Sequence, residues 1–285
     1  MAETARADVA LAARGLARSR TEGAALIRAG QVLLDGRPVR RPSDRVAADA
    51  TLRLRDPGPR YVSRAAHKLV SALEAFPDVA VAGRRALDAG ASTGGFTQVL
   101  LERGAERVAA VDVGHNQLAP PVRADPRVLV REGLNVRDLR AEDIDGPVDL
   151  VVSDLSFISL RLVLAPLAGV CRPGAELLLM VKPQFEVGKD RIGHGGVVRD
   201  PELHVDTVMT VAERAHSLGV GVEAVTASPL PGPAGNVEYF LSMHASRAGC
   251  PGDLSGDELR SSIEDAVAAG PAALGPRRRR TRTRP

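Results

Sequence analysis

Several residue types are scarce in this sequence of 285 residues, which has no tryptophan, five phenylalanines, two tyrosines and two cysteines. The cysteines, Cys171 and Cys250, cannot supply the framework of a disulfide-built protein, and they fit a reducing compartment. No apolar run reaches the roughly 18 residues that a membrane-spanning helix needs. The first residues lack the apolar core of a secretory signal, so nothing predicts export. We therefore expect a cytoplasmic protein, long enough to build its own core.

Lysine is the most informative scarcity. Of 38 basic residues only three are lysines, Lys68, Lys182 and Lys189, and the other 35 are arginines. Arginine can replace lysine wherever a positive charge is enough, but it does not lose its proton in proteins and lacks a compact ammonium. The surviving lysines are therefore candidates for chemistry, and survival by chance is the alternative.

The net charge of +3 is unevenly distributed along the chain. Residues 1–62 hold 12 arginines against seven acids, and residues 277–285 hold six arginines and no acid, so the remainder carries −8. A basic head and tail on an acidic middle indicate a polyanionic partner that is contacted from one end.

The head reads as a small α/β module. Residues 6–14 fit an amphipathic helix, and a capping-box pattern from Ser19 to Glu22 opens a second helix that Gly30 closes. Residues 31–39 predict a hairpin, and residues 46–55 alternate as one strand. The stretch GLARSRTEGAALIRAGQVLLDGRPVRRPSDRV, within residues 6–55, resembles the S4-like RNA-binding domain.

That resemblance implies RNA contact, which agrees with the arginines around the second helix and the hairpin. Arginine grips phosphate bidentately, and phosphate contacts supply most non-specific affinity for nucleic acid. A solvated basic face is the alternative. The predicted RNA-binding residues are Arg6, Arg18, Arg20, Arg28, Arg37, Arg40 and Arg41.

The chain after residue 84 alternates strand-like and helix-like runs, which predicts an α/β fold with a Rossmann-like, doubly wound sheet. The last two strands follow each other without a helix, so the last strand should be antiparallel. The expected strands are residues 85–88, 107–113, 127–131, 148–154, 176–182, 219–227 and 237–244. Helices are expected between most of them, notably at residues 96–103, 160–171 and 201–218. The expected domains are residues 1–59, a linker at 60–63, a second domain at 64–248, and a short helix with a disordered basic tail at 249–285.

A glycine-rich turn follows the first of these strands in LDAGASTGGF, and Asp112 ends the next strand, where a carboxylate can bind the ribose of an adenosine ligand. Ser92 stands where a dinucleotide fingerprint has its second glycine, and Asp88 suits a cationic ligand better than a pyrophosphate. We therefore expect S-adenosylmethionine, with a dinucleotide or a purely structural turn as alternatives. The predicted cofactor-binding residues are Asp88, Gly90, Ser92, Thr93, Gly94, Asp112, Asn135 and Asp154.

Three more residues lie at or beside predicted strand ends, where open α/β sheets place functional groups: Asp154, Lys182 and Glu238. A helix cap is the alternative for Asp154 and a paired surface carboxylate for Glu238. Together with Lys68, on a helix predicted over residues 63–76, they match the Lys-Asp-Lys-Glu tetrad of FtsJ-like ribose methyltransferases. The chain over about residues 6–245 resembles the TlyA-type rRNA methyltransferases, whose members have also been called haemolysins.

This resemblance implies S-adenosylmethionine-dependent 2′-O-methylation of ribose, of cytidine in small- or large-subunit rRNA or both, and binding to ribosomal subunits. Lys182 is the predicted general base, Asp154 would hold it, and Lys68 and Glu238 would orient the ribose and tune Lys182. No metal is required. A non-catalytic RNA-binding protein and a membrane-active haemolysin are the alternatives. The sequence names neither the nucleotide nor the oligomeric state, for which a monomer is favoured.

Overall fold

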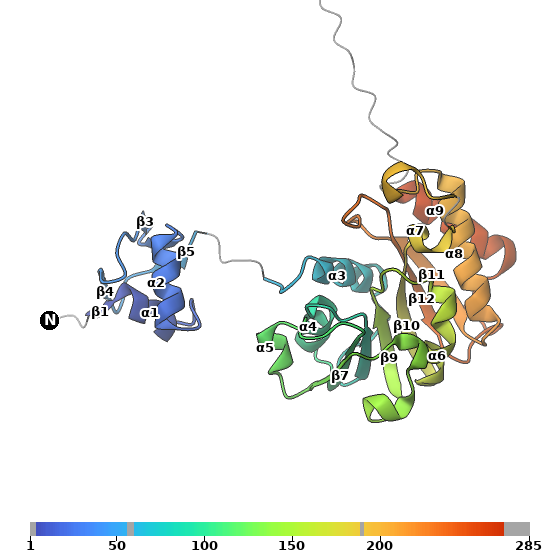
Figure 1. Cartoon of the computed structure of the whole chain (residues 1–285), viewed down its shortest axis with the longest axis horizontal. Helices are drawn as coiled ribbons and strands as arrows, with labels where there is room; N and C mark the ends of the chain where they lie inside the picture. The colour runs from blue at the N-terminus through green and yellow to red at the C-terminus, as the bar shows by residue number, and fades with distance from the viewer. Residues whose placement is uncertain (1–3, 56–59, 189–190, 271–285) are drawn as a thin grey trace, which may run out of the picture. The chain divides into compact units, whose positions relative to one another are not determined.

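The computed structural model describes residues 4–55, 60–188 and 191–270, which fall into two compact units divided between Arg60 and Tyr61 (Figure 1). Residues 56–59, at the end of the expected first domain, and the part of the expected basic tail from residue 271 lie outside the described residues.

The first unit contains two helices and two small sheets, and both helices and the hairpin lie where the sequence predicts them. Ser19 caps the second helix by accepting a hydrogen bond from the backbone N–H of Glu22. Asp35 and Gly36 both have positive φ, 48° and 79°, which suits a tight hairpin turn. The helices are α1 (Ala7–Ala13) and α2 (Arg20–Arg28); strand β1 (Thr4–Arg6) pairs with β4 (Arg45–Ala47), and β2 (Val32–Leu34) lies between β3 (Arg37–Pro38) and β5 (Leu52–Leu54).

Two local expectations for this unit are wrong. Residues 46–55 do not form one strand, because the chain turns between β4 and β5, which pair in different sheets. The carboxylate of Asp35 accepts the N–H of Thr51 at 2.8 Å and fixes the end of that turn. The carboxylate of Glu22 accepts the N–H of Arg18 rather than that of Ser19, so the capping box is not reciprocal.

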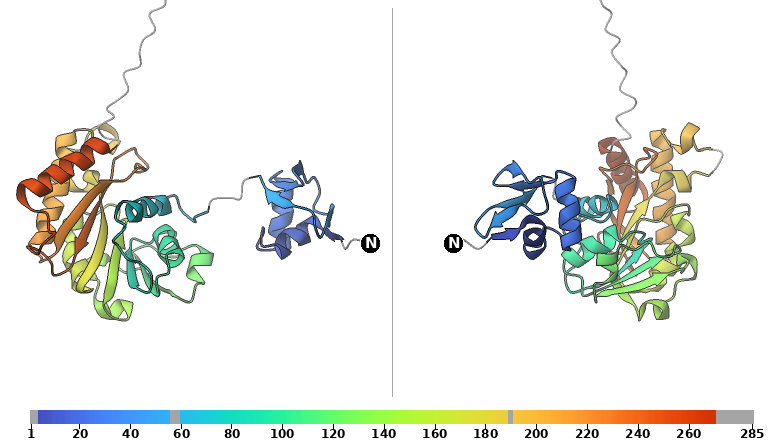
Figure 2. Two further views of the ribbon diagram at one scale, coloured as in Figure 1. Left: turned by 180° about the vertical axis from the view of Figure 1, so that it is seen from behind. Right: turned by 60° about the vertical axis from the view of Figure 1, so that its left-hand side comes forward.

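A seven-stranded sheet forms the second unit, and every strand expected from the sequence is present (Figures 1 and 2). Only β12 runs antiparallel, and it lies between β10 and β11. In sheet order the strands are β11 (Gly221–Ala227), β12 (Tyr239–His244), β10 (Cys171–Val181), β9 (Val148–Ser153), β6 (Arg85–Ala89), β7 (Arg107–Asp112) and β8 (Val128–Glu132).

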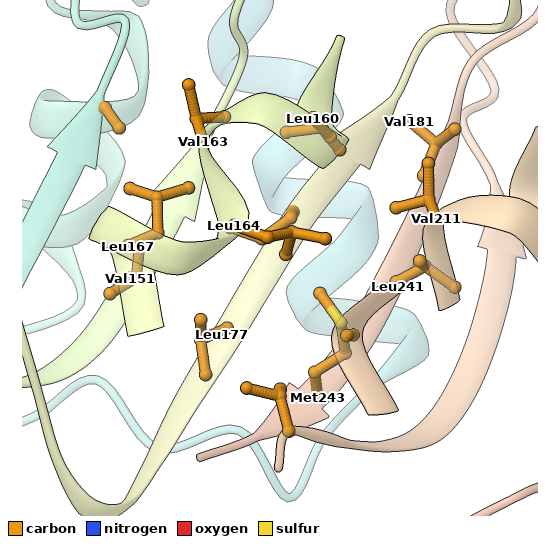
Figure 3. Packing of buried hydrophobic residues seen from close by; sticks show 14 of the residues in the cluster. Val151, Leu160, Val163, Leu164, Leu167, Leu177, Val181, Val211, Leu241 and Met243 are labelled. Carbon is orange, nitrogen blue, oxygen red and sulfur yellow. The ribbon is translucent and has the colours of Figure 1, made fainter. Parts of the chain in front are cut away.

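Helices cover both faces of this sheet, and alternation along the strands explains why. Leu177, Leu179 and Val181 of β10 join a core with one set of helices, and Leu178 and Met180 join a second core on the other face. Figure 3 shows part of the first core. The helices of the first face are α6 (Leu164–Gly169), α8 (Pro201–His216) and α9 (Gly256–Ala269), and those of the second are α3 (Ala65–Ala75) and α4 (Gly95–Glu102).

The remaining helical segments are short, and one expected helix is broken. The run predicted over residues 160–171 becomes a 3₁₀ turn followed by α6, and β10 already begins at Cys171. The short segments are α5 (Pro120–Arg123), α7 (Pro183–Glu186) and the 3₁₀ turns Val136–Asp138, Ala141–Ile144, Leu160–Leu162 and His194–Gly196.

The second unit of the structure extends beyond both boundaries of the second domain expected from the sequence. Tyr61 is buried and packs edge-on against His67, with ring centroids 5.2 Å apart, so residues 61–63 belong to this unit rather than to a linker. At the other end, Leu259, Ile263 and Val267 of α9 are buried in the first core. Helix α9 is therefore part of the second unit, whereas the domain expected from the sequence ends at residue 248 and leaves this helix outside.

Candidate active site

Strand register brings the ends of β9, β10 and β12 together at one edge of the sheet. Val181 pairs with Tyr239 in the antiparallel ladder, so Lys182 and Glu238 follow as neighbours just beyond it. Asp154 comes directly after β9, which pairs in parallel with β10. The reversed direction of β12 explains why Glu238, at the start of its strand, lies at the carboxyl ends of the others.

Helix α3 adds the fourth predicted residue, and all four form one charge network. Lys68 Nζ donates to Glu238 Oε2 at 2.5 Å and to Asp154 Oδ2 at 3.5 Å. Lys182 Nζ pairs with Asp154 Oδ1 at 2.6 Å and donates to Ser156 Oγ at 2.9 Å. Asp154 thus holds one amino group on each of its oxygens, in a network of two cations and two anions.

Glu238 differs from the other three residues of the network. They line the smaller of the two cavities described below, and Glu238 does not. It is 1% exposed, and its described partner is Lys68. A Cβ added to Gly232 would lie 2.7 Å from Glu238 Oε1, which explains a glycine in the loop that covers this carboxylate. The structure shows Glu238 in contact with Lys68, and its expected role in orienting the ribose and tuning Lys182 stays a prediction.

Two adjoining cavities open beside this network, with volumes of about 510 Å³ and 200 Å³. Gly90, Ser92, Asp154 and Ser156 line both. The smaller cavity also holds Lys68, Lys182 and the exposed Arg64. The arrangement can place one ligand in the larger cavity and a second reactant beside the two lysines.

The larger cavity gathers most of the residues predicted to bind a cofactor: Gly90, Ser92, Asp112, Asn135 and Asp154, while Thr93 lines the smaller one. Asp112 accepts the N–H of Ser92 at 2.8 Å and that of Gly114 at 2.7 Å, which fixes its carboxylate at the cavity wall. Two carboxylates, those of Asp112 and Asp154, lie on this wall. There is little room beside Gly90, where a Cβ would lie 3.1 Å from Leu155. Both features suit a cationic adenosine ligand held close to the backbone. The residues present therefore fit S-adenosylmethionine.

Two of the predicted cofactor residues, Asp88 and Gly94, line neither cavity. Asp88 is fully buried and accepts a hydrogen bond from Thr97 Oγ1 at 2.6 Å. Gly94 precedes α4 with a φ of 93°, and a Cβ there would lie 2.8 Å from Leu118. Both residues therefore stabilise the turn through contacts on its buried side and do not line the cavities that would hold a ligand.

The buried Asp88 predicts an unusual pH dependence of stability. Burial raises the pKa of Asp88 to about 7, against a smaller lowering by the hydrogen bond from Thr97. The unfolded chain releases this proton near about pH 4, so between these values the folded state binds more protons. The contribution of Asp88 to the free energy of unfolding therefore falls as pH rises from about 4 to 7 and is level above that.

Replacing Asp88 with asparagine removes this titration. We expect the unfolding temperature of Asp88→Asn, relative to that of the unmodified chain, to rise between pH 5 and pH 8, by an amount worth on the order of 3 kcal/mol. Differential scanning calorimetry at intervals of one pH unit measures this, with the exposed Asp138→Asn as the matched control. Parallel curves for Asp88→Asn and the unmodified chain would contradict the buried titration.

The seven arginines predicted to bind RNA are all in the first unit, and the structure divides them into two groups. Arg28, Arg37, Arg40 and Arg41 are exposed. Arg6, Arg18 and Arg20 also reach solvent, but they bind carboxylates of their own chain, Arg18 that of Glu22 and the other two that of Asp8.

Sequence reasoning missed two residues at the site. Ser156 binds Lys182 and lines both cavities, and its place two residues after Asp154 was the available signal. Phe157 is 92% exposed with a φ of 63°, lines the larger cavity and lies 5.4 Å from the ring of Phe185. Aromatic side chains are the usual surfaces on which RNA bases stack.

The described residues contain neither a metal-binding cluster nor a membrane-spanning helix. Over residues 4–55, 60–188 and 191–270, no group of three or more histidines, cysteines and acids could hold a metal ion. No helix in the same part of the chain has the length and apolar character to cross a membrane.

Comparison with known proteins gives matches over both units. The FtsJ-like methyltransferase family matches residues 61–245, and the S4 domain matches residues 5–52. The 16S/23S rRNA (cytidine-2′-O)-methyltransferase TlyA of Mycobacterium tuberculosis is 54% identical over 95% of this chain and 100% of its own. The 23S rRNA (cytidine-2′-O)-methyltransferase TlyA of Campylobacter jejuni is 36% identical over 63% of this chain and 69% of its own.

A solved structure is similar over nearly the whole length. It is a hemolysin-named protein of Streptococcus thermophilus, with a TM-score of 0.69 and 35% identity over 96% of this chain and 97% of its own. The similarity therefore spans both units and extends to proteins named for two different activities.

Proposed function

Because the chain belongs to the FtsJ-like methyltransferases, and among them to the TlyA-type proteins with an S4 domain, we propose that it methylates the ribose 2′-oxygen of a cytidine in rRNA. One observation carries the proposal: Lys68, Asp154 and Lys182 meet in one network at the junction of two cavities. The larger cavity would hold S-adenosylmethionine, and the smaller would receive the ribose.

The residues divide the work by their contacts. Asp112 and the other residues of the larger cavity would hold S-adenosylmethionine, which would supply an electrophilic methyl group for the 2′-oxygen. Lys182, in its uncharged amine form, would accept the proton of the 2′-hydroxyl at Nζ and become an ammonium group, which Asp154 and Ser156 hold in place. Lys68 faces the same cavity, and buried Glu238 holds it there. Phe157 offers a surface on which a base could stack.

The cofactor residues yield a binding prediction. Asp112→Asn should raise the Kd for S-adenosylmethionine by about 10- to 100-fold, since a hydrogen bond to a charged group contributes about 1.5–3 kcal/mol. Isothermal titration calorimetry measures the Kd, with Asp138→Asn, which lines neither cavity, as control. Unchanged affinity would mean that the ribose of the cofactor lies elsewhere, and tight NADH binding without S-adenosylmethionine binding would reject the cofactor assignment.

The substrate follows from the relatives and from the basic first unit. Ribosomal subunits are the proposed partners, and the cytoplasm is the proposed place of action. The name of the M. tuberculosis relative specifies the rRNA of both subunits, 16S and 23S, whereas that of the C. jejuni relative specifies 23S rRNA. The two subunits should therefore be assayed separately. Transfer of labelled methyl from S-adenosylmethionine to the rRNA of either subunit supports the proposal, and absence of transfer to both rejects it.

A further inference from the structure

Asp8, in the first turn of α1, binds two guanidinium groups that come from different parts of the first unit. Its carboxylate accepts bonds from Arg6 Nε and Nη2 and from Arg20 Nε, each at 3.0 Å. A fourth bond comes from the backbone N–H of Val9. The Asp8 side chain is 3% exposed, whereas those of Arg6 and Arg20 are 40% and 65% exposed. One buried anion therefore anchors two cations that reach solvent.

We propose that Asp8 is a positioning residue, which holds Arg6 and Arg20 as a pre-arranged pair for two phosphates of rRNA. The inference rests on the proposed function, since it needs an RNA substrate. Arg6 keeps Nη1, and Arg20 keeps both of its Nη groups, without a hydrogen bond to any residue that the structure describes. These are the groups with which arginine grips phosphate, and a guanidinium already fixed at Nε loses less side-chain entropy when it binds.

Simple electrostatics predicts the opposite effect of Asp8. A carboxylate among arginines lowers the local charge, so its removal should strengthen binding to a polyanion. The hydrogen bonds from Arg6 hold the pKa of Asp8 well below its ordinary value, so the carboxylate is charged at neutral pH. The positioning role predicts instead that removal weakens binding, because both guanidinium groups lose their anchor.

A second carboxylate on the same module serves as a matched control. Glu22, in the first turn of α2, binds Arg18, which precedes the helix, and this pair is more open to solvent, with side chains 30% and 77% exposed. An exposed pair holds its partners weakly. Glu22→Gln should therefore leave RNA affinity unchanged or raise it slightly, as expected from loss of a negative charge alone.

The packing of the unit gives a reason to expect Asp8→Asn to fold. Leu11 and Ile27 join the two helices through a buried core that does not include Asp8. Gly23 permits their close approach, since a Cβ there would lie 2.9 Å from the carbonyl oxygen of Asp8. The asparagine can also keep one acceptor oxygen.

The experiment measures binding of the full-length chain to purified large and small ribosomal subunits, by filter binding at two salt concentrations. Asp8→Asn should raise the Kd by about tenfold, as expected when two long side chains must be ordered on binding. In an Arg6→Ala, Arg20→Ala background, the same change should leave the Kd unaltered or lower it. An unchanged or lower Kd for Asp8→Asn alone, or an equal rise in both backgrounds, would overturn the inference.

A second pair of variants keeps the test valid if Asp8→Asn melts at a reduced temperature. Arg20→Lys retains the charge but loses Nε and the fork, so it should raise the Kd by about tenfold. Arg53→Lys, at an exposed arginine of β5 that is not among the predicted RNA-binding residues, should change the Kd by less than about twofold. Equal effects of the two would contradict positioning by Asp8. If the unmodified chain binds and methylates subunits while these variants behave alike, the inference alone fails; if it binds neither subunit, the proposed function fails with it.

Discussion

Replacement of Lys182 by arginine is expected to reduce single-turnover methyl transfer by about 10²–10⁴-fold, nearly as much as replacement by alanine, because loss of a general base has this magnitude. Arginine keeps the positive charge and can still contact Asp154 and Ser156, which bind Lys182 in the structure. It cannot accept a proton, since guanidinium stays charged in proteins. The variant therefore separates a base from a fixed charge.

The controls for this variant are affinities and a pH profile. Binding of S-adenosylmethionine and of ribosomal subunits should be largely retained in Lys182→Arg, and its residual rate should rise steadily with pH as hydroxide replaces the base. The alternative is that Lys182 stays charged throughout the reaction, and its ion pair with Asp154 is compatible with that role as well. Arginine retaining most of the activity would show that Lys182 acts as a fixed charge, and the base would then be sought at Lys68.

Deletion of residues 1–59 is expected to abolish rRNA methylation while leaving cofactor binding intact. The second unit folds around its own cores and contains both cavities, and Tyr61, which packs in it, is kept by this deletion. The first unit carries all seven arginines predicted to bind RNA phosphates, and loss of several such contacts should lower affinity for RNA by at least about 100-fold. Filter binding and methyl transfer to isolated subunits measure the effect.

Two comparisons complete this experiment. Calorimetry should give the truncated chain the same Kd for S-adenosylmethionine as the full chain. A full-length variant with alanine at Arg28, Arg37, Arg40 and Arg41 keeps both units and should lose part of the RNA affinity. Methylation of subunits by the truncated chain at the full rate would show that the first unit is not needed for docking.

The sheet was accessible from the sequence because its signals are local. Strand alternation, buried runs and glycine turns each depend on neighbouring residues, and all seven strands of the second unit were found from them. The lysines were informative for another reason: in a chain that uses arginine almost everywhere, Lys68 and Lys182 stand out, and the structure brings both to Asp154.

The features that could not be predicted from the sequence depend on contacts between residues distant in the chain or on the direction in which a side chain points. The bond from Arg20 to Asp8 joins α2 to α1, and no local sequence pattern predicts it. Asp88 stands at a strand end as expected, but its carboxylate points inward to Thr97. Alternation continued through the turn between β4 and β5, so periodicity alone suggested a single strand.

Identification of the methylated nucleoside tests the central claim most directly. Purified full-length protein is incubated with labelled S-adenosylmethionine and, separately, with small and large ribosomal subunits that lack the modification. The rRNA is then digested to nucleosides for mass spectrometry. The account predicts 2′-O-methylcytidine in at least one subunit, absent when Lys182→Ala replaces the unmodified chain. A methyl group on a base, or no methylation of either subunit by a protein that binds the cofactor, would contradict it.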